Sequence, residues 1–276
     1  CYNMPITSLV HYETETDGVI QGFKVDAVLV DKTTAFQRAR VYQTPAFGKV
    51  LVLDDETQSA QSDEAIYHET LVHPVFMIHP APTNVLIIGG GEGATAREVL
   101  RYPSVKNVIM LDIDAELMEI CKEHLPEWAG PAVWSDPRLH VHAIDAFTWL
   151  ETHLEAFDIV IMDLCDPDPA TPDNQINRFY TKEFIETLFS KHIRAGGLLV
   201  AQIGDYTALP EVSAVFREAT GVVHNYVQYI PSFTSQWGFV LAGTPLKSAS
   251  AAFARLPTGL KFINPGKLAG IFSHSE

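Results

Sequence analysis

The sequence predicts an α/β protein whose parallel sheet ends in an antiparallel hairpin and follows a small antiparallel β domain. Three observations predict this fold. From residue 84 onward, apolar runs rich in β-branched residues alternate with helical patterns, as in a parallel sheet with right-handed crossovers. The last two runs, 222–231 and 237–245, have no helix between them and predict a hairpin. Residues 18–61 show β patterns only, so we expect a β domain over 1–61 and an α/β domain over 62–276.

The expected elements follow in chain order. Residues 20–30, 37–42 and 49–54 have β patterns, and a helix containing Pro74 is expected from residue 62 to 78. The five expected parallel strands are 84–90, 107–114, 139–145, 157–166 and 196–204. The expected helices after them are 94–102, 115–125, 146–154, 181–193 and 211–220. Residues from 247 onward are too weakly patterned for a prediction.

The composition favours a small cationic ligand over a nucleic acid or a membrane. The 276 residues include 34 acidic and 19 basic side chains, and the formal net charge is −15. Such a charge disfavours a nucleic-acid groove or an anionic membrane surface, although it also serves solubility. Three cysteines form no even framework, and no apolar run approaches the ~20 residues of a membrane span. We therefore expect a cytoplasmic protein, and Cys1 at the first position suggests a fragment or added residues.

The turn after the first parallel strand has the pattern of a nucleotide-binding turn. Gly89, Gly91 and Ala94 fit G-x-G-x-x-A, in which glycine lets the backbone approach a ligand, although tight turns also use glycine for steric reasons alone. Asp112, at the tip of the second strand, is where doubly wound folds hold ribose hydroxyls. Glu92 inside the turn would repel a pyrophosphate. The sequence therefore predicts a nucleoside ligand without phosphates, such as an S-adenosyl compound with its sulfonium.

Carboxylates follow four of the expected parallel strands. Because ligands bind beyond the carboxyl ends of such strands, we expect these acids to converge on one rim: Glu92, Asp112, Asp114, Asp145, Asp163 and Asp166. Single acids at strand ends also begin turns, so this alternative stays open for Asp163 and Asp166. The functional interpretation makes Asp163 a base and Asp166 an anchor for a cation. The Pro- and Asp-rich loop that follows has the length of a lid.

Two histidines near Glu69 superficially resemble a zinc-protease motif. His68 and His73 are five residues apart instead of four, so they do not share a helical face. No Cys/His cluster completes such a site, and we predict no metal. We expect His73 and His79 to be structural.

The combination of GGGEG, LDID, IDA, DLCDP, YHE and PSFTSQWG resembles the polyamine aminopropyltransferases, the family of spermidine, spermine and thermospermine synthases, over residues 36–243. The resemblance implies a small N-terminal β domain, a methyltransferase-like Rossmann domain, and dimers or tetramers joined through the N-terminal part. It implies decarboxylated S-adenosylmethionine as the co-substrate, with no permanently bound cofactor and with 5'-methylthioadenosine as a product. The other partner would be a polyamine.

The resemblance also implies residue roles. Asp163 would accept the proton, and the hydroxyl of Tyr67 would orient the attacking amine. The donor would be bound by Gln37, Gly89, Gly91, Glu92, Asp112, Asp145 and Ala146. The acceptor amine would be bound by His68, Glu92, Asp163, Asp166, Gln202 and Trp237.

Departures from the spermidine-synthase pattern narrow the choice of acceptor amine. They fall at Glu92, Asp112, His68, the pair 164–165 and the segment 231–236, and all resemble thermospermine synthases or bacterial relatives that use triamines or agmatine. Trp237 adds a flat wall suited to a methylene chain. We expect spermidine as acceptor and thermospermine as product. The alternatives are a spermidine synthase using putrescine or agmatine, an S-adenosylmethionine methyltransferase, and an inactive binding homologue.

Overall fold

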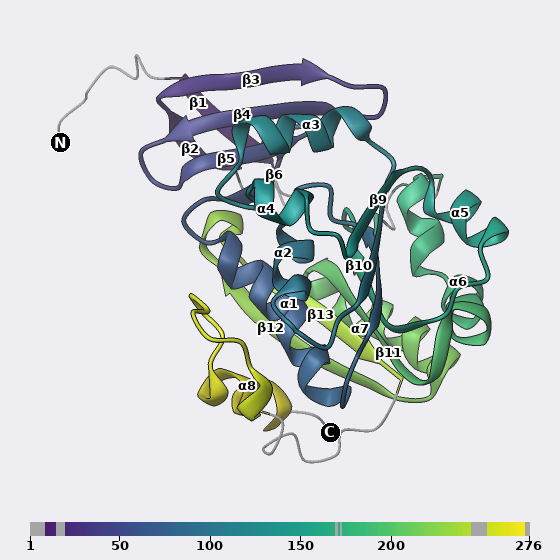
Figure 1. The fold of residues 1–276 in the computed structure, drawn as a ribbon. Coiled ribbons are helices and arrows are strands. Elements are labelled where there is room, and N and C mark those ends of the chain that lie inside the picture. The colour runs from purple at the N-terminus through teal and green to yellow at the C-terminus, as the bar shows by residue number, and fades with distance from the viewer. Residues whose placement is uncertain (1–8, 15–19, 169–170, 172, 244–252, 274–276) are drawn as a thin grey trace.

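The computed structural model describes residues 9–14, 20–168, 171, 173–243 and 253–273, arranged as two sheets with helices and an N-terminal hairpin (Figure 1). The hairpin consists of β1 (Leu9–Thr14) and β2 (Ile20–Val25), paired antiparallel. The smaller sheet is antiparallel throughout, in the order β3 (Ala27–Thr33), β4 (Arg38–Thr44), β5 (Gly48–Leu53) and β6 (Glu56–Ala60). In Figure 1, α3 (Ala115–His124) lies across this sheet, below β3 and above β5 and β6 in the view.

Alternation along β4 and β5 gives the small sheet two buried faces. Val41 and Leu51 point to one face and pack with Leu117 and Trp128 of the α/β part. The other face includes Val50, which packs in a cluster with Phe23 of β2. A sheet this small buries little surface alone, and here it is covered on one side by the hairpin and on the other by the larger part of the chain.

The larger sheet has seven strands in the order β12-β13-β11-β10-β7-β8-β9. Five of them are parallel: β7 (Asn84–Gly89), β8 (Asn107–Asp112), β9 (Leu139–Ala143), β10 (Phe157–Asp163) and β11 (Ile193–Asp205). The antiparallel hairpin is β12 (Val223–Ile230) and β13 (Ser235–Ala242), and β13 pairs with β11. The predicted fold class is therefore confirmed. The strand order reverses between β7 and β10, which is where such sheets bind ligands.

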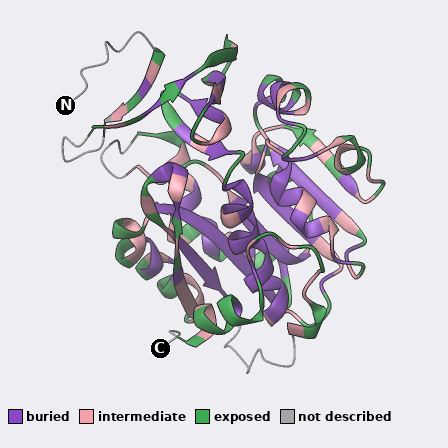
Figure 2. Cartoon of the chain, turned by 90° about the vertical axis from the view of Figure 1, so that its left-hand side faces the viewer, coloured by how far each residue is buried: buried purple, intermediate pink, exposed green. Residues whose placement is uncertain are grey.

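Helices cover both faces of this sheet, because its central strands are apolar on both sides. On β7, Val85 and Ile87 belong to one buried cluster, and Leu86 and Ile88 belong to the other. The helices of the first face are α1 (Glu64–Ile78) and α2 (Ala94–Leu100). Those of the second are α5 (Ala146–Thr152), α6 (Lys182–Thr187) and α7 (Leu209–Thr220). Figure 2 shows the buried residues concentrated in the strands between these two layers.

The C-terminal segment, whose structure was not predicted from the sequence, packs on α1. It includes α8 (Pro265–Ser273), and Leu268 of this helix belongs to the first buried cluster. The buried carboxylate of Glu69 accepts hydrogen bonds from the main-chain N–H groups of Lys261, Phe262 and Ile263, at 2.7, 2.8 and 2.7 Å. Glu69 belongs to α1, which also carries Tyr67 and His68. The C-terminal segment therefore supports the wall that α1 forms in the site described below.

Several element boundaries differ from those expected. The expected β segment 20–30 divides into two strands at Asp26. The strands expected to end at 114, 145 and 166 end at 112, 143 and 163. Beyond the first two tips, Asp114 and Asp145 cap the helices that follow. The helix expected over 181–193 changes to a π-helical turn, Leu188–His192, before β11. The short strands β1 and β6 and the short helix α4 (Pro131–Trp134) were not expected.

Asp63 is a buried residue at the start of the helix expected over 62–78. It precedes α1 without capping it, and its carboxylate instead accepts hydrogen bonds from the main-chain N–H and the hydroxyl of Ser232.

None of the helices in the described ranges combines the length and apolarity that crossing a membrane requires.

Candidate active site

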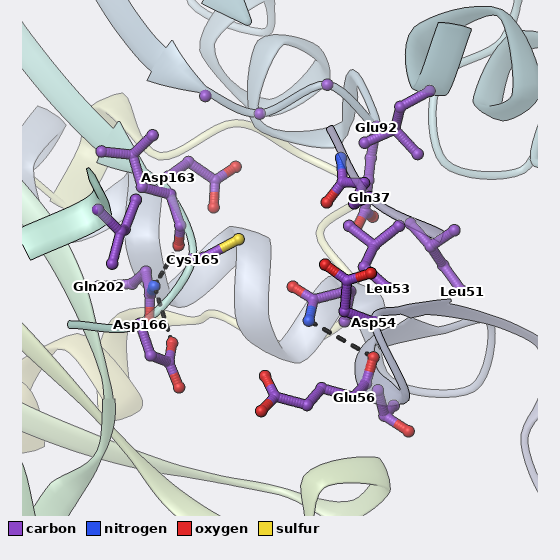
Figure 3. A pocket seen from close by; sticks show the side chains of 18 of the residues that line it. Gln37, Leu51, Leu53, Asp54, Glu56, Glu92, Asp163, Cys165, Asp166 and Gln202 are labelled. Atoms are coloured by element: carbon purple, nitrogen blue, oxygen red, sulfur yellow. Dashed lines mark hydrogen bonds between the residues drawn. The ribbon is translucent and has the colours of Figure 1, made fainter. Parts of the chain in front are cut away.

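A cavity of about 1080 Å³ opens beyond the carboxyl ends of β7 to β11, at the point where the strand order reverses. The N-terminal sheet supplies one wall, α1 another, and the β12–β13 hairpin a third. The thirteen residues to which the resemblance assigns a role all line this cavity: Gln37, Tyr67, His68, Gly89, Gly91, Glu92, Asp112, Asp145, Ala146, Asp163, Asp166, Gln202 and Trp237. Figure 3 shows carboxylates entering it from opposite sides.

The glycine turn after β7 lets three strand tips approach one another. Gly89 has φ +84°, and a Cβ there would lie 2.1 Å from the main-chain oxygen of Asp163. A Cβ on Gly91 would lie 2.6 Å from Oδ2 of Asp112. Side chains at these positions would therefore push β8 and β10 away from β7, so the turn requires glycine.

Asp163, the last residue of β10, is held by two hydroxyl groups. Tyr67 donates a hydrogen bond of 2.7 Å to Oδ1, and Thr95 donates one of 2.6 Å to Oδ2. Burial raises the pKa of Tyr67 well above its usual value, and the charge of Asp163 raises it further. Tyr67 therefore keeps its proton near neutral pH and acts as a donor.

Glu92 enters the cavity from the turn and is tied to the N-terminal sheet. Ser59 donates a hydrogen bond of 2.7 Å to its Oε2, and Trp128 donates one of 2.9 Å to the hydroxyl of Ser59. Burial raises the pKa of Glu92 to about 7, although His68 and Ser59 act in the opposite direction. A cation bound beside Glu92 would favour its ionised form.

His68 lies between two carboxylates. Its Nδ1 is 2.7 Å from the main-chain oxygen of Glu64 and 3.3 Å from the Oε2 of that residue, and its Nε2 is 4.0 Å from Oε2 of Glu92. Burial alone would lower the pKa of His68, but its hydrogen bond to Glu64 and the charge of Glu92 raise it overall. Hydrogen bonds from His68 and Arg97 outweigh burial at Glu64 and lower the pKa of Glu64 to about 2.

Asp112 and Asp114 at the tip of β8 have different surroundings. Asp112 lines the cavity, and burial raises its pKa to about 6. Asp114, expected on the same rim, does not line the cavity; it caps α3 by accepting a hydrogen bond of 3.0 Å from the N–H of Leu117. Asp114 also accepts hydrogen bonds from Thr34 and Gln37, at 2.6 and 3.0 Å, which fasten the N-terminal sheet to this tip.

Asp145 and Ala146 form a polar edge at the start of α5. Oδ1 of Asp145 accepts a hydrogen bond of 2.8 Å from the N–H of Phe147, and Oδ2 accepts one of 2.7 Å from Arg178. The Arg178 guanidinium lies 4.3 Å from the centre of the Phe147 ring. Ala146 is the first helical residue, where a main-chain N–H has no acceptor within the helix. The edge suits a flat, hydrogen-bonding heterocycle.

Asp166, Gln202 and Trp237 form the opposite wall. The Gln202 side chain donates to Oδ1 of Asp166 at 3.1 Å and to the main-chain oxygen of Leu164, and it accepts from Gly204 N–H and Trp237 Nε1, both at 2.8 Å. These four bonds occupy the whole amide, so Gln202 orients its neighbours. Burial raises the pKa of Asp166 to about 7.

His73, which was expected to be structural, lies outside the cavity. His73 is fully buried and contacts the hydroxyl of Tyr102 at 2.8 Å and Oε2 of Glu98 at 3.1 Å. Among the residues that the structure describes, no group of three or more His, Cys, Asp or Glu side chains could hold a metal ion.

Several polar residues of the site were not predicted from the sequence. Glu56 and Asp205 line the cavity, and Ser59 and Thr95 hold two of its carboxylates. The alternation in 56–60 and the place of Thr95 just after the glycine turn carry weak signals. Short polar runs do not distinguish a cavity wall from a solvated surface.

The fold and the cavity together define a Rossmann-like α/β protein with an acid-lined cavity at the switch point of its sheet. Residues 64–250 match the family model described as the spermine/spermidine synthase domain, and residues 9–61 match the spermidine synthase tetramerisation domain. The chain belongs to the spermine/spermidine synthase family, whose members are polyamine aminopropyltransferases.

Curated relatives and a solved structure agree with this family. The chain is 41% identical to a polyamine aminopropyltransferase of Aeropyrum pernix over 79% of this chain and 69% of the relative. It is 36% identical to the thermospermine synthase ACAULIS5 of Arabidopsis thaliana over 83% of this chain and 68% of the relative. A crystal structure of spermidine synthase in complex with the transition-state analogue AdoDATO has the same fold, with a TM-score of 0.87 and 24% identity over 98% of this chain and 93% of that chain.

Proposed function

We propose that this protein transfers the aminopropyl group of decarboxylated S-adenosylmethionine to an amine of spermidine, giving thermospermine and 5'-methylthioadenosine. The hydrogen bond between Tyr67 and Asp163, within the same cavity as Glu92 and Asp112, is the observation that carries this proposal. The donor is a co-substrate that is consumed in each turnover.

Asp163 acts as the base of the reaction. The nitrogen lone pair of the acceptor attacks the methylene carbon next to the sulfonium, the carbon–sulfur bond breaks, and its electrons remain on sulfur as a neutral thioether. An amine with a pKa near ~10 is mostly protonated at neutral pH, so a carboxylate must take its proton. Tyr67 keeps its proton and orients the reacting pair. Positioning of two reactants can supply ~7–11 kcal/mol of the barrier reduction.

The donor occupies the part of the cavity near the glycine turn. Asp112 accepts hydrogen bonds from the ribose hydroxyls, and Asp145 with the N–H of Ala146 binds adenine. Gln37 contacts the nucleoside from the N-terminal sheet, and Glu92 binds the aminopropyl ammonium. Intact S-adenosylmethionine carries a carboxylate that Asp163 and Glu92 would repel, so this arrangement selects the decarboxylated donor.

The acceptor occupies the part of the cavity near β11 and the β12–β13 hairpin. Asp166 and His68 bind its nitrogen groups, Gln202 holds Asp166 and Trp237 in place, and Trp237 packs against its methylene chain. The similarity to ACAULIS5 and the polar groups at both ends of the cavity support a triamine. Putrescine is the main alternative, because the family includes spermidine synthases.

We also propose self-association through the N-terminal part. The match to the tetramerisation domain supports it, as do large apolar side chains that are exposed on the first three strands: Leu9, Tyr12, Ile20, Val28 and Leu29. Exposed apolar side chains that gather in one region are typical of an interface.

One reaction tests the proposed function. The protein is incubated with labelled decarboxylated donor and with spermidine, putrescine or agmatine, and the products are separated under conditions that resolve thermospermine from spermine. We expect label in thermospermine and release of methylthioadenosine. Label in spermidine from putrescine alone would reassign the acceptor. Methyl transfer from intact S-adenosylmethionine would make the protein a methyltransferase, and binding without any transfer would make it an inactive homologue.

A further inference from the structure

The buried hydroxyl of Thr95 makes direct contact with the carboxylate assigned as the base. Thr95 is the second residue of α2, is fully buried, and donates its hydrogen bond of 2.6 Å to Oδ2 of Asp163. Tyr67 occupies the other oxygen, Oδ1, at 2.7 Å. Each carboxylate oxygen therefore has one hydroxyl donor, and the two donors come from different helices on the same side of the sheet.

The glycine turn makes this contact possible. Gly90 has φ +76°, and a Cβ there would lie 3.3 Å from Oδ2 of Asp163 and 3.8 Å from Cβ of Thr95. A side chain at Gly90 would thus lie against the carboxylate and beside the threonine. The three consecutive glycines therefore leave room for the Asp163 carboxylate as well as for the nucleoside.

Thr95 differs from the other groups around Asp163 because it does not line the cavity. It touches neither the donor nor the acceptor in the proposed arrangement, so any effect on catalysis must pass through Asp163. We propose that Thr95 is a positioning residue for the base, fixing the plane of the Asp163 carboxylate. This inference rests on the proposed aminopropyl transfer with Asp163 as the base.

Two consequences distinguish this role from simple packing. Without the hydroxyl, the Asp163 carboxylate can rotate about its Cβ–Cγ bond. Its oxygen is then less often placed to accept the proton of the amine, and kcat falls. Because Thr95 does not line the cavity, the KM of the donor should not change.

The test compares Thr95→Val, which keeps the shape but removes the hydroxyl, with Thr95→Ser, which keeps the donor. The kcat and the KM values of both substrates are measured for each variant. We expect Thr95→Val to lower kcat about ten-fold, with the KM of the donor unchanged. Thr95→Ser should retain the native kcat.

Three results would overturn the inference: a native kcat in Thr95→Val, equal losses of kcat in the valine and serine variants, or a change confined to KM. If the valine variant does not fold, Thr95→Ala takes its place, because the smaller side chain cannot clash. The unmodified protein is assayed first. If it transfers no aminopropyl group, the proposed function fails; if it transfers normally and the variants match it, only the role of Thr95 fails.

Discussion

Tyr67 of α1 donates a hydrogen bond of 2.7 Å to Asp163 at the end of β10, joining residues that are 96 positions apart in the chain. This bond connects the helix that precedes the sheet with the strand at its switch point. Burial and the neighbouring carboxylate raise the pKa of Tyr67, so the hydroxyl donates throughout the working pH range. The carboxylate is thereby oriented toward the cavity.

Replacing Tyr67 by phenylalanine should lower kcat by about ten- to a hundred-fold, because the variant loses one hydrogen bond to a charged group. Steady-state kinetics with both substrates measures the effect. Tyr226→Phe is the matched control: it removes another buried hydroxyl, which donates to the main-chain oxygen of Thr70 at 3.2 Å and does not line the cavity. Equal kcat losses in both variants would contradict a specific role for Tyr67.

Glu92 should make donor binding pH-dependent. Its pKa is about 7 in the protein without ligand, against a usual 4.5, so below pH 7 it is mostly neutral and attracts the donor's ammonium less. We expect the Kd of the decarboxylated donor to rise by up to about ten-fold per pH unit as pH falls from 7 to 5. Calorimetry should also detect proton release on binding near pH 7. Glu92→Gln should weaken binding and flatten this dependence; a native pH dependence in that variant would assign the proton to another group.

Asp166 should reduce stability at high pH. Its folded pKa of about 7 lies above the usual 3.8, so the folded state binds more protons than the unfolded state between these values. Its contribution to the free energy of unfolding therefore falls as pH rises from about 4 to 7. We expect Asp166→Asn to be more stable than the native protein by about 2–4 kcal/mol at pH 8 and similar to it near pH 4, in urea titrations.

The control for this comparison is Glu119→Gln, a substitution at an exposed residue of α3 whose side chain is 73% accessible. It should change stability little at either pH. A stability gain of Asp166→Asn that is the same at pH 4 and pH 8 would show that the carboxylate charge is not its cause.

Glu69 should stabilise the C-terminal segment on α1. Its carboxylate accepts three main-chain hydrogen bonds from residues 261–263, and removing it leaves these N–H groups without their acceptor. We expect Glu69→Ala to lower the free energy of unfolding by about 2–4 kcal/mol, with faster proteolysis after residue 252. Glu69→Gln, which keeps one acceptor oxygen, should lose less. A loss below about 1 kcal/mol in the alanine variant would argue against this role.

The fold could be predicted from the sequence because its signals are local. Val85 to Ile88 are apolar on both faces, which indicates a parallel strand covered by helices, and the glycines after them mark the turn. Strand ends were less predictable, because Asp114 looks like a rim acid in sequence and its role as a helix cap depends on where α3 begins. Residues 261–263 have no periodic pattern in the sequence. They are held by hydrogen bonds to one distant carboxylate, that of Glu69.

The candidate site was predictable where a residue belongs to a motif at a strand tip, as for Asp163 and Asp112. It was not predictable where a single side chain crosses from another element. Ser59 reaches Glu92 from the N-terminal sheet, and Thr95 reaches Asp163 from α2. Long-range partners of this kind leave no spacing rule in the sequence, so only the assembled structure identifies them.

Asp163 removes the proton of the acceptor amine, and the donor binds in the same cavity without needing this carboxylate. The most direct measurement compares the native protein with Asp163→Asn, following methylthioadenosine release and, separately, donor binding by calorimetry. We predict a fall in kcat of about 10²–10⁴-fold with a donor Kd that changes little. A variant that turns over at nearly the native rate, or that loses activity only because it no longer binds the donor, would contradict the claim.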